Sequence, residues 1–261
     1  AILLAACGKT SSELARGYER DLRAMKQDGY GRADTRPLDA AWTAEDLERN
    51  FAHVVHARDH GRFGEQPLRK WRSPGLYKVV SMGAGPQADE RAHMRDLARR
   101  LSAATGLPVR EAADDEVASI VILYLDYEER AAMLRVPDLE TDNPVLHELI
   151  EALQEDENRL CVYNTLHDAE DPEQWVTLAY TVIRSELPKE WRNSCLDEEV
   201  TQMFGPAFDH DDVRPSMFND DEEFLFLTDH DEAMLRLIYD PRLRSGMTEA
   251  QTAPIVREIL A

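Results

Sequence analysis

The sequence lacks the short motifs that mark several large classes of enzyme and binding protein. No glycine-rich phosphate loop follows a candidate strand, and no Gly-x-Ser-x-Gly nucleophile motif occurs. The acidic stretch from residue 209 to 223 does not have the spacing of an EF-hand calcium loop. These absences argue against a phosphate-binding loop, a serine hydrolase of the α/β type and an EF-hand.

Basic residues are scarce as well. The chain has 30 Lys and Arg against 51 Asp and Glu, which gives a formal net charge of -21. This charge repels nucleic-acid phosphates, so no nucleic acid partner is expected, whereas a cationic ligand is compatible with it. The 261 residues, 43% of them hydrophobic, are enough for one large domain with an apolar core.

Cysteine is rare, and the first of the three cysteines predicts a location. Leu4-Ala5-Ala6-Cys7 resembles a bacterial lipobox. The resemblance implies cleavage before Cys7 and acyl chains that anchor the protein to a membrane. Gly8 is not the Asp that favours inner-membrane retention, so we expect the periplasm and the outer membrane of a Gram-negative bacterium. The alternative is an ordinary apolar N-terminus with a buried Cys7.

The other two cysteines, Cys161 and Cys195, would then lie in an oxidising compartment, where two remaining thiols pair. We therefore predict a disulfide between them. No C-x-x-C pair and no His at zinc-finger spacing accompany them, which argues against structural zinc. The alternative is a pair of buried, reduced thiols in a cytosolic protein.

Hydrophobic periodicity predicts an α+β fold. Residues 117 to 127 are β-branched and apolar on both faces, so we expect a central strand there that is too short to span a membrane. We expect a signal remnant over 1–7, a helical extension over 8–64 and one domain over 65–261. The other expected strands are 76–82, 160–165 and 175–183, and the expected helices are 10–27, 43–56, 89–105, 143–154, 189–204, 229–239 and 248–260.

The helix expected over 189–204 has a polar face beside its apolar stripe. The apolar stripe consists of Leu196, Val200, Met203 and Phe204, and the adjoining face of Cys195, Glu198, Glu199 and Gln202. Zinc peptidases of the His-Glu-x-x-His type place two metal ligands one turn apart on such a face, with the Glu between them as general base.

The stretch after this helix makes the similarity more specific. Gly205 falls where a metzincin zinc peptidase ends its active-site helix, and Pro215-Ser216-Met217-Phe218 resembles the Met-turn beneath the metal. The resemblance implies a metzincin-like mixed sheet packed by two long helices, with C-terminal helices after it. Residues 195–202, 215–224 and 227–248 more closely resemble the bacterial family called domain of unknown function 2927. That similarity covers about residues 65 to 250, and the family's members include candidate lipoproteins.

The zinc histidines of a metzincin are absent from this chain. Glu198 and Gln202 replace the first two, and Phe208 stands at the third position, with Asp209 and His210 beside it. A neutral amide is a poor zinc ligand, so we expect no metal and no other cofactor. Without a metal, a general base contributes roughly 10² to 10⁴-fold, too little for peptide hydrolysis by Glu199 alone.

These observations predict a protein that binds rather than catalyses, with an envelope protein or a cationic ligand as its partner. The binding residues would be Glu198, Gln202, Asp209 and His210. One alternative is a hydrolase that uses Glu199 as its base and a non-standard metal set of Glu198, Asp209 and His210. Another is a purely structural envelope protein, in which Glu198 and Gln202 are buried, bonded to each other and adjoin no cavity.

Three further histidines fall on one face of the helix expected over 43–56 and just beyond it. His53, His56 and His60 have no carboxylate or cysteine at ligand spacing. Such residues more often stabilise the C-terminus of a helix than hold a metal ion.

Overall fold

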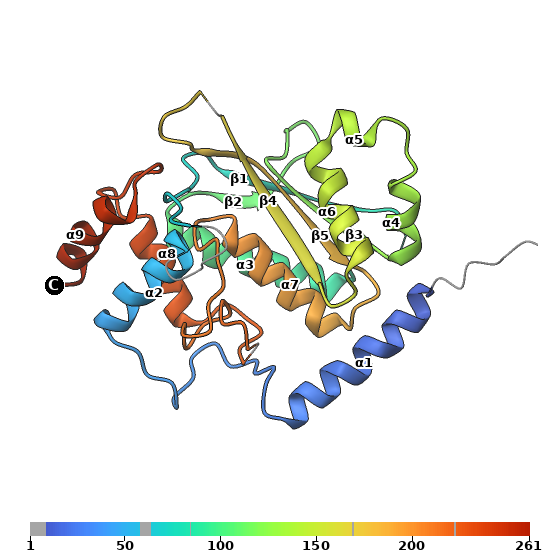
Figure 1. Ribbon diagram of the computed structural model, residues 1–261, viewed down its shortest axis with the longest axis horizontal. Helices are drawn as coiled ribbons and strands as arrows, with labels where there is room; N and C mark the ends of the chain where they lie inside the picture. Colours follow the sequence, from blue (N-terminus) through green and yellow to red (C-terminus); the bar gives the residue numbers. More distant parts are fainter. Residues whose placement is uncertain (1–8, 58–63, 84, 169, 222) are drawn as a thin grey trace, which may run out of the picture.

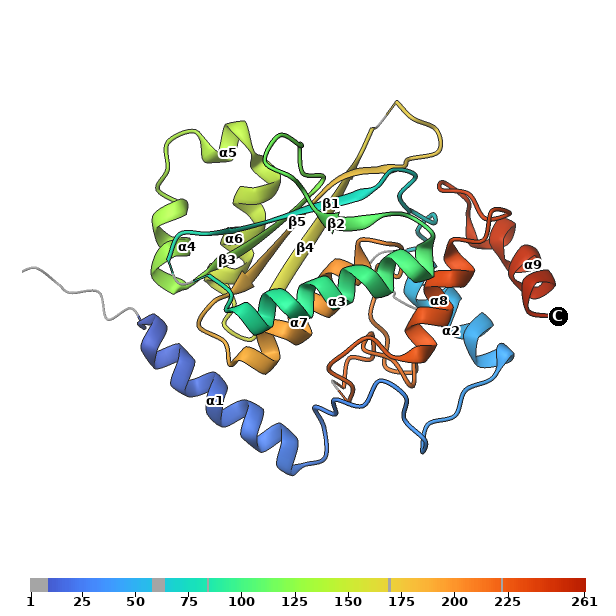
Figure 2. The ribbon, with the colours of Figure 1, turned by 180° about the vertical axis from the view of Figure 1, so that it is seen from behind.

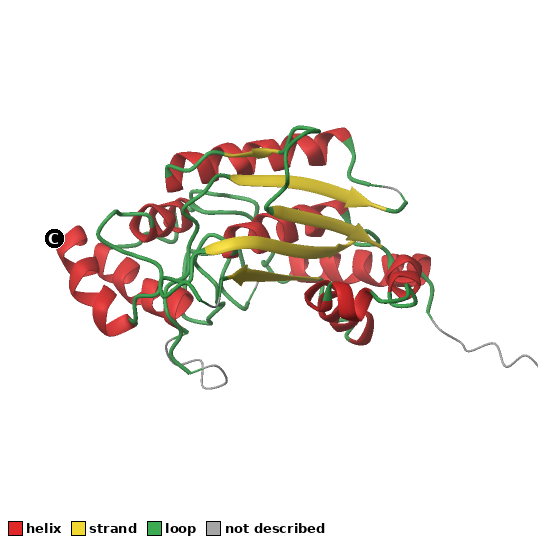
Figure 3. Ribbon diagram, turned by 90° about the horizontal axis from the view of Figure 1, so that it is seen from above, coloured by secondary structure: helices red, strands yellow, loops and turns green. Residues whose placement is uncertain are grey.

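A five-stranded sheet forms the centre of the chain in this computed structural model, which describes residues 9–57, 64–83, 85–168, 170–221 and 223–261. The strand order is β2-β1-β3-β5-β4. Four strands are parallel, and the edge strand β4 runs antiparallel to β5 (Figure 3). The strands are β1 (Gly75–Ser81), β2 (Val109–Glu111), β3 (Ile120–Leu125), β4 (Cys161–His167) and β5 (Val176–Arg184).

Helices cover both faces of this sheet (Figures 1 and 2). The helices of one face are α3 (Ala88–Thr105) and α7 (Lys189–Gln202), and those of the other are α4 (Tyr127–Met133), α5 (Leu139–Asp142) and α6 (Pro144–Glu155). Alternate residues of β3 serve the two faces, because successive side chains of a strand point to opposite sides. Ile122 and Tyr124 belong to the core under α3 and α7, and Leu123 and Leu125 to the core under α6. The mixed α+β class is therefore confirmed.

The central strand is shorter than the sequence indicates. Val117 is 89% exposed and lies before the strand, which begins at Ile120. At the other end Asp126 accepts a hydrogen bond from the backbone of Glu129 and caps α4, so Tyr127 is helical. The expected strand over 117–127 is thus wrong at both ends. The short elements β2, α4 and α5 were not predicted.

Four more helices lie outside the two layers: α1 (Ser11–Gln27), α2 (Ala44–His56), α8 (Asp229–Ile238) and α9 (Glu249–Leu260). The capping box predicted at Thr10 and Glu13 is present, and α1 buries Leu14, Tyr18 and Leu22. Figure 1 shows α2, α8 and α9 together at one end of the molecule. Within the described residues, none of the helices has the length and apolar character needed to cross a membrane.

The predicted disulfide is present. Cys161, the first residue of β4, is bonded to Cys195 in α7, 34 residues away. In the chain-entropy model, a disulfide that closes a loop of this length stabilises the folded state by roughly 3 to 4 kcal/mol. The bond also fixes the edge strand to the helix that carries Glu198 and Glu199.

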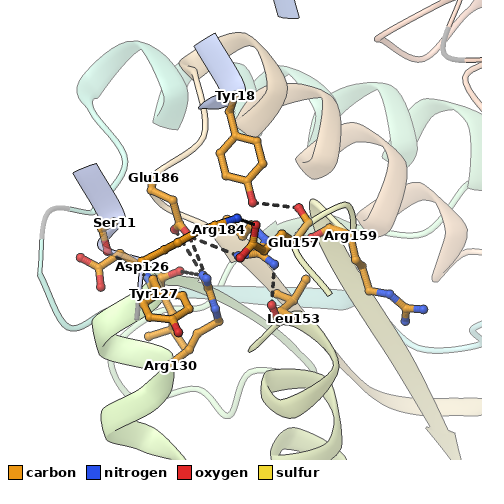
Figure 4. Close-up of polar contacts among 12 residues, drawn as sticks. Ser11, Tyr18, Asp126, Tyr127, Arg130, Leu153, Glu157, Arg159, Arg184 and Glu186 are labelled. Carbon is orange, nitrogen blue, oxygen red and sulfur yellow. Dashed lines mark hydrogen bonds and ion pairs between the residues drawn. The ribbon is translucent and has the colours of Figure 1, made fainter. Parts of the chain in front are cut away.

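A buried ion cluster lies at the carboxyl ends of β3 and β5, beneath α1 (Figure 4). Arg130 and Arg184 both pair with Glu186, at 2.7 and 3.3 Å, and all three side chains are at most 2% exposed. Arg184 also donates to the backbone carbonyls of Asp156 and Arg159, just beyond the C-terminus of α6. Two guanidinium groups thus share one carboxylate and several carbonyls, which holds α4, α6 and β5 together.

Candidate functional site

The helix α7 places its acidic residues at the edge of the sheet. Its apolar stripe is buried as predicted, since Leu196, Val200, Met203 and Phe204 all belong to the core. Glu198 is half-buried, and Glu199 is only 6% exposed. The polar face of the helix is therefore covered by other elements rather than by solvent alone.

Glu198 and Glu199 line a cavity of about 180 Å³, which we call the acidic cleft. Its carboxylates are Glu198, Glu199, Asp209 and Asp220. Its remaining walls are the Cys161–Cys195 disulfide, the apolar or aromatic residues Leu160, Trp191, Met217, Phe224 and Leu225, and the polar residues Asn158, Ser194 and Asn219. Among the described residues that line the cleft, none is a Lys, Arg or His. The cleft thus combines negative charge with apolar surface.

Gln202 holds one of the carboxylates in place. Its side-chain nitrogen donates to Asp209 Oδ1 at 2.7 Å. Burial, followed by the charge of Asp220, raises the pKa of Asp209 to about 7, although the bond from Gln202 acts in the opposite direction. Gln202 is thus bonded to Asp209 beside a cavity, whereas the purely structural alternative requires a bond to Glu198 and no cavity.

Glu199 is the most deeply buried acid of the cleft. Burial and the neighbouring Asp209 raise its pKa well above the ordinary value, and Arg159 opposes this only in part. Tyr163 is half-buried near the two acids. Its hydroxyl donates to the carbonyl of Ala207 at 2.9 Å and therefore does not donate to Glu199 or Asp209. Within the described chain no group forms a hydrogen bond with the Glu199 carboxyl.

The raised pKa of Asp209 predicts a specific dependence of stability on pH. An unfolded Asp ionises near pH 4, whereas folded Asp209 keeps its proton to about pH 7, so its contribution to stability is lost as pH rises through this window. We expect the free energy of unfolding of Asp209→Asn to exceed that of wild type by on the order of 2 kcal/mol at pH 8. The two proteins should be equal at pH 4. Urea unfolding at both pH values measures this.

The control for this comparison is Asp115→Asn, which removes one exposed carboxylate from the loop between β2 and β3. It should match wild type within about 0.5 kcal/mol at either pH. A stability difference for Asp209→Asn that is the same at pH 4 and pH 8 would contradict the assignment.

The described histidines His53, His56 and His210 do not gather around the cleft as one group. The ring of His210 stacks on that of His53 from α2, with 3.9 Å between centroids. His56 instead contacts the carbonyl of Gln66 and the hydroxyl of Thr252. His60 lies outside the described residues. The sequence placed His53 and His56 on one helical face, but it gave no signal that His53 meets His210.

The turn at 215–218 is held from below by α8. Asp231 is fully buried and accepts hydrogen bonds from the Ser216 hydroxyl at 2.6 Å and from the Met217 backbone at 3.2 Å. It also caps α8 by accepting from the backbone and hydroxyl of Thr228. This network fixes Met217 in the wall of the acidic cleft.

The N-terminal residues build part of the surroundings of the cleft, which the sequence did not indicate. The backbone of Arg32 donates to the carbonyl of Glu223 and accepts from Leu225. The side chains of Arg32 and Arg214 both pair with Glu223 and lie over the ring of Phe224. These contacts secure the wall that contains Phe224 and Leu225.

Two more N-terminal contacts lie nearby. The ring of Tyr18 in α1 meets Trp191 edge to face at 6.2 Å between centroids, and Phe208 donates its backbone N–H to the carbonyl of Val54 in α2. The residues before the sheet therefore touch the cleft or its neighbours at three places.

The described part of the chain offers no evident site for a metal ion. Among the residues that the structure describes, no three His, Cys, Asp or Glu side chains are grouped so that they could hold one. Glu198 and Asp209 both line the cleft, whereas His210, the third member of the alternative metal set, is not among its lining residues.

Cys7 lies outside the described residues, so its lipidation remains an expectation.

Comparison with known proteins identifies a family. Residues 44–258 match the profile of a family described as "Protein of unknown function (DUF2927)". No curated protein and no solved structure matches the chain. The matched region begins in α2 and includes every residue of the acidic cleft.

Proposed function

This chain belongs to the DUF2927 family, and we propose that it is an envelope lipoprotein that binds a partner in the acidic cleft without catalysis. The proposal rests on the form of the cleft and on the replacement of the zinc histidines by Glu198 and Gln202. The negative charge of the cleft favours a partner that carries positive charge. The similarity of residues 4–7 to a lipobox supports a lipid anchor on Cys7 and a location at the periplasmic face of the outer membrane.

The order of the elements supports a metzincin-like origin of the scaffold. A strand, a long helix and further strands precede α7, and a turn with Met217 and the helix α8 follow it. Gly205, with a positive φ of 132°, lies just after α7 where the chain turns away. This order is similar to that of a metzincin-like core.

The single observation that carries the non-catalytic proposal is the position of Gln202. In a zinc peptidase of this type that position holds the second histidine ligand. Here an amide stands there, and its nitrogen is engaged by Asp209. A zinc ion would need a basic ligand atom at this point, and the Gln202 amide does not provide one.

Metal analysis of the purified protein tests the proposal. We expect less than about one zinc per ten chains after gel filtration without chelator, because a neutral amide is a poor zinc ligand. A matched variant, Gln202→His, restores the ligand type of a zinc peptidase and should raise zinc retention. Stoichiometric zinc in the wild type, lost in Glu198→Ala or His210→Ala, would overturn the non-catalytic proposal.

One observation favours a second candidate, a hydrolase with Glu199 as general base. The buried Glu199 and the half-buried Asp209 are neighbouring acids with raised pKa values, and such groups are typical of acid–base sites. In that case Glu199→Gln would abolish a peptidase or esterase activity of the wild type. The same assay on Asp115→Asn provides the control.

A further inference from the structure

The acidic cleft has two features beyond its charge that bear on the ligand. Glu199 is buried, with only 6% of its surface exposed, yet it has no hydrogen-bond partner within the described chain. It also lines the cavity. Trp191, also 6% exposed and also part of the lining, has an indole N–H that no described residue accepts. Buried polar groups without partners are uncommon in folded proteins, and each leaves a cost that a ligand can remove.

The two unpartnered groups differ in what they need. Burial and the charge of Asp209 raise the pKa of Glu199, so a cation with N–H donors would stabilise the ionised form of its carboxyl and of its acidic neighbours. The indole N–H of Trp191 can only donate, so it needs an oxygen acceptor such as a carbonyl. A ligand that satisfies both therefore has a cationic end and a carbonyl oxygen.

Size and apolar surface narrow the ligand further. A volume of about 180 Å³ is below the roughly 300–1,000 Å³ of pockets for drug-sized molecules. It suits one long side chain. Leu160, Trp191 and Met217 supply apolar wall, which matches the aliphatic stem of a lysine, whereas its ammonium would sit among the carboxylates.

We propose that the acidic cleft takes an alkylammonium group, and specifically the lysine side chain of a protein or peptide partner. The ammonium lies among Glu198, Glu199 and Asp209, and the stem packs on Trp191. The indole nitrogen is buried in the unliganded structure, so the ring turns on binding and its N–H then donates to the backbone carbonyl of the same lysine. This inference rests on the proposed binding function and names the chemical class of its partner.

The test compares three small probes by isothermal titration calorimetry on the full chain. N-acetyl-lysine methylamide has the cation and the carbonyl, cadaverine has the cation alone, and N-acetyl-norleucine methylamide has the carbonyl and stem alone. We expect the lysine compound to bind at least tenfold more tightly than the norleucine compound. A cadaverine affinity equal to that of the lysine compound would identify free amines as the source and overturn the lysine assignment.

Variants locate the binding to the cleft. Glu199→Gln should weaken the lysine compound at least tenfold, and Trp191→Phe should weaken it while leaving cadaverine unchanged. Asp220→Asn, at the exposed rim, is a second variant that tests the cleft if Glu199→Gln proves unstable, and it should weaken binding several-fold. Asp115→Asn is the matched control and should bind as wild type does.

Two results would overturn the inference: equal affinity for the lysine and norleucine compounds, or unchanged lysine binding in both Glu199→Gln and Asp220→Asn. Metal content, measured on the same preparations, keeps the two proposals separate. Stoichiometric zinc with retained lysine selectivity would remove the non-catalytic proposal and leave the ligand assignment in place. Metal-free protein that does not select lysine would overturn the ligand assignment and leave the non-catalytic proposal in place.

Discussion

Replacing Glu186 by Gln is expected to lower the free energy of unfolding by about 3–5 kcal/mol, because it leaves two buried guanidinium groups without their anion. Glu186 accepts from Arg130 and Arg184, and neither arginine is more than 1% exposed. Burial and the charge of Arg130 already lower the pKa of Arg184. Gln has the same shape as Glu, so the loss measures charge and not volume. Urea denaturation at pH 7 gives the value.

A nearby carboxylate provides the control. Glu157 pairs with Lys9 at the surface, where side-chain exposure is 41% and 59%. Glu157→Gln should therefore change stability by less than about 1 kcal/mol.

A double variant that also changes Arg130 tests the cause of the Glu186 effect. If an excess of buried positive charge is responsible, adding Arg130→Met to Glu186→Gln removes one unbalanced cation. The double variant should then be more stable than the sum of the two single changes predicts, by about 1–3 kcal/mol. Strict additivity would show that Glu186 acts through packing instead.

The ion cluster also illustrates what the sequence could and could not predict. Periodicity and caps identified the long elements, because a capping box such as Thr10 with Glu13 acts within four residues. Arg130, Arg184 and Glu186 look like ordinary surface charges in sequence. Their burial depends on how β3, β5 and α6 come together, which local patterns do not encode.

The same division applies to the candidate site. The face of α7 that contains Glu198, Glu199 and Gln202 followed from helical spacing, and the Cys161–Cys195 disulfide followed from counting thiols. The bond between Gln202 and Asp209 was not predicted, because it depends on how the chain returns after the helix. The contribution of α1, α2 and Arg32 to the surroundings of the cleft is more distant still along the chain and has no local signal.

Asp231→Ala is expected to be about as costly as the loss of Glu186, at about 3–5 kcal/mol, since it leaves several buried donors without an acceptor. Burial alone would raise the pKa of Asp231, but hydrogen bonds from His230, Ser216 and Thr228 lower it below the ordinary 3.8. A carboxyl of this kind contributes stability above about pH 4, and the contribution is lost as pH falls through the folded-state pKa. The deficit of the variant should therefore be full at pH 7 and should shrink below pH 4.

The turn and the cleft should respond together to this substitution. Asp231 accepts from the backbone of Met217, which lines the acidic cleft, so Asp231→Ala should also weaken the lysine compound although the residue does not line the cavity. Ser216→Ala removes one of the same hydrogen bonds and should cost about 1 kcal/mol. In a double-mutant cycle the two changes should show a coupling energy of about 0.5–3 kcal/mol. Additive effects, or unchanged lysine binding in a folded Asp231→Ala, would mean that the turn does not depend on α8 for its position.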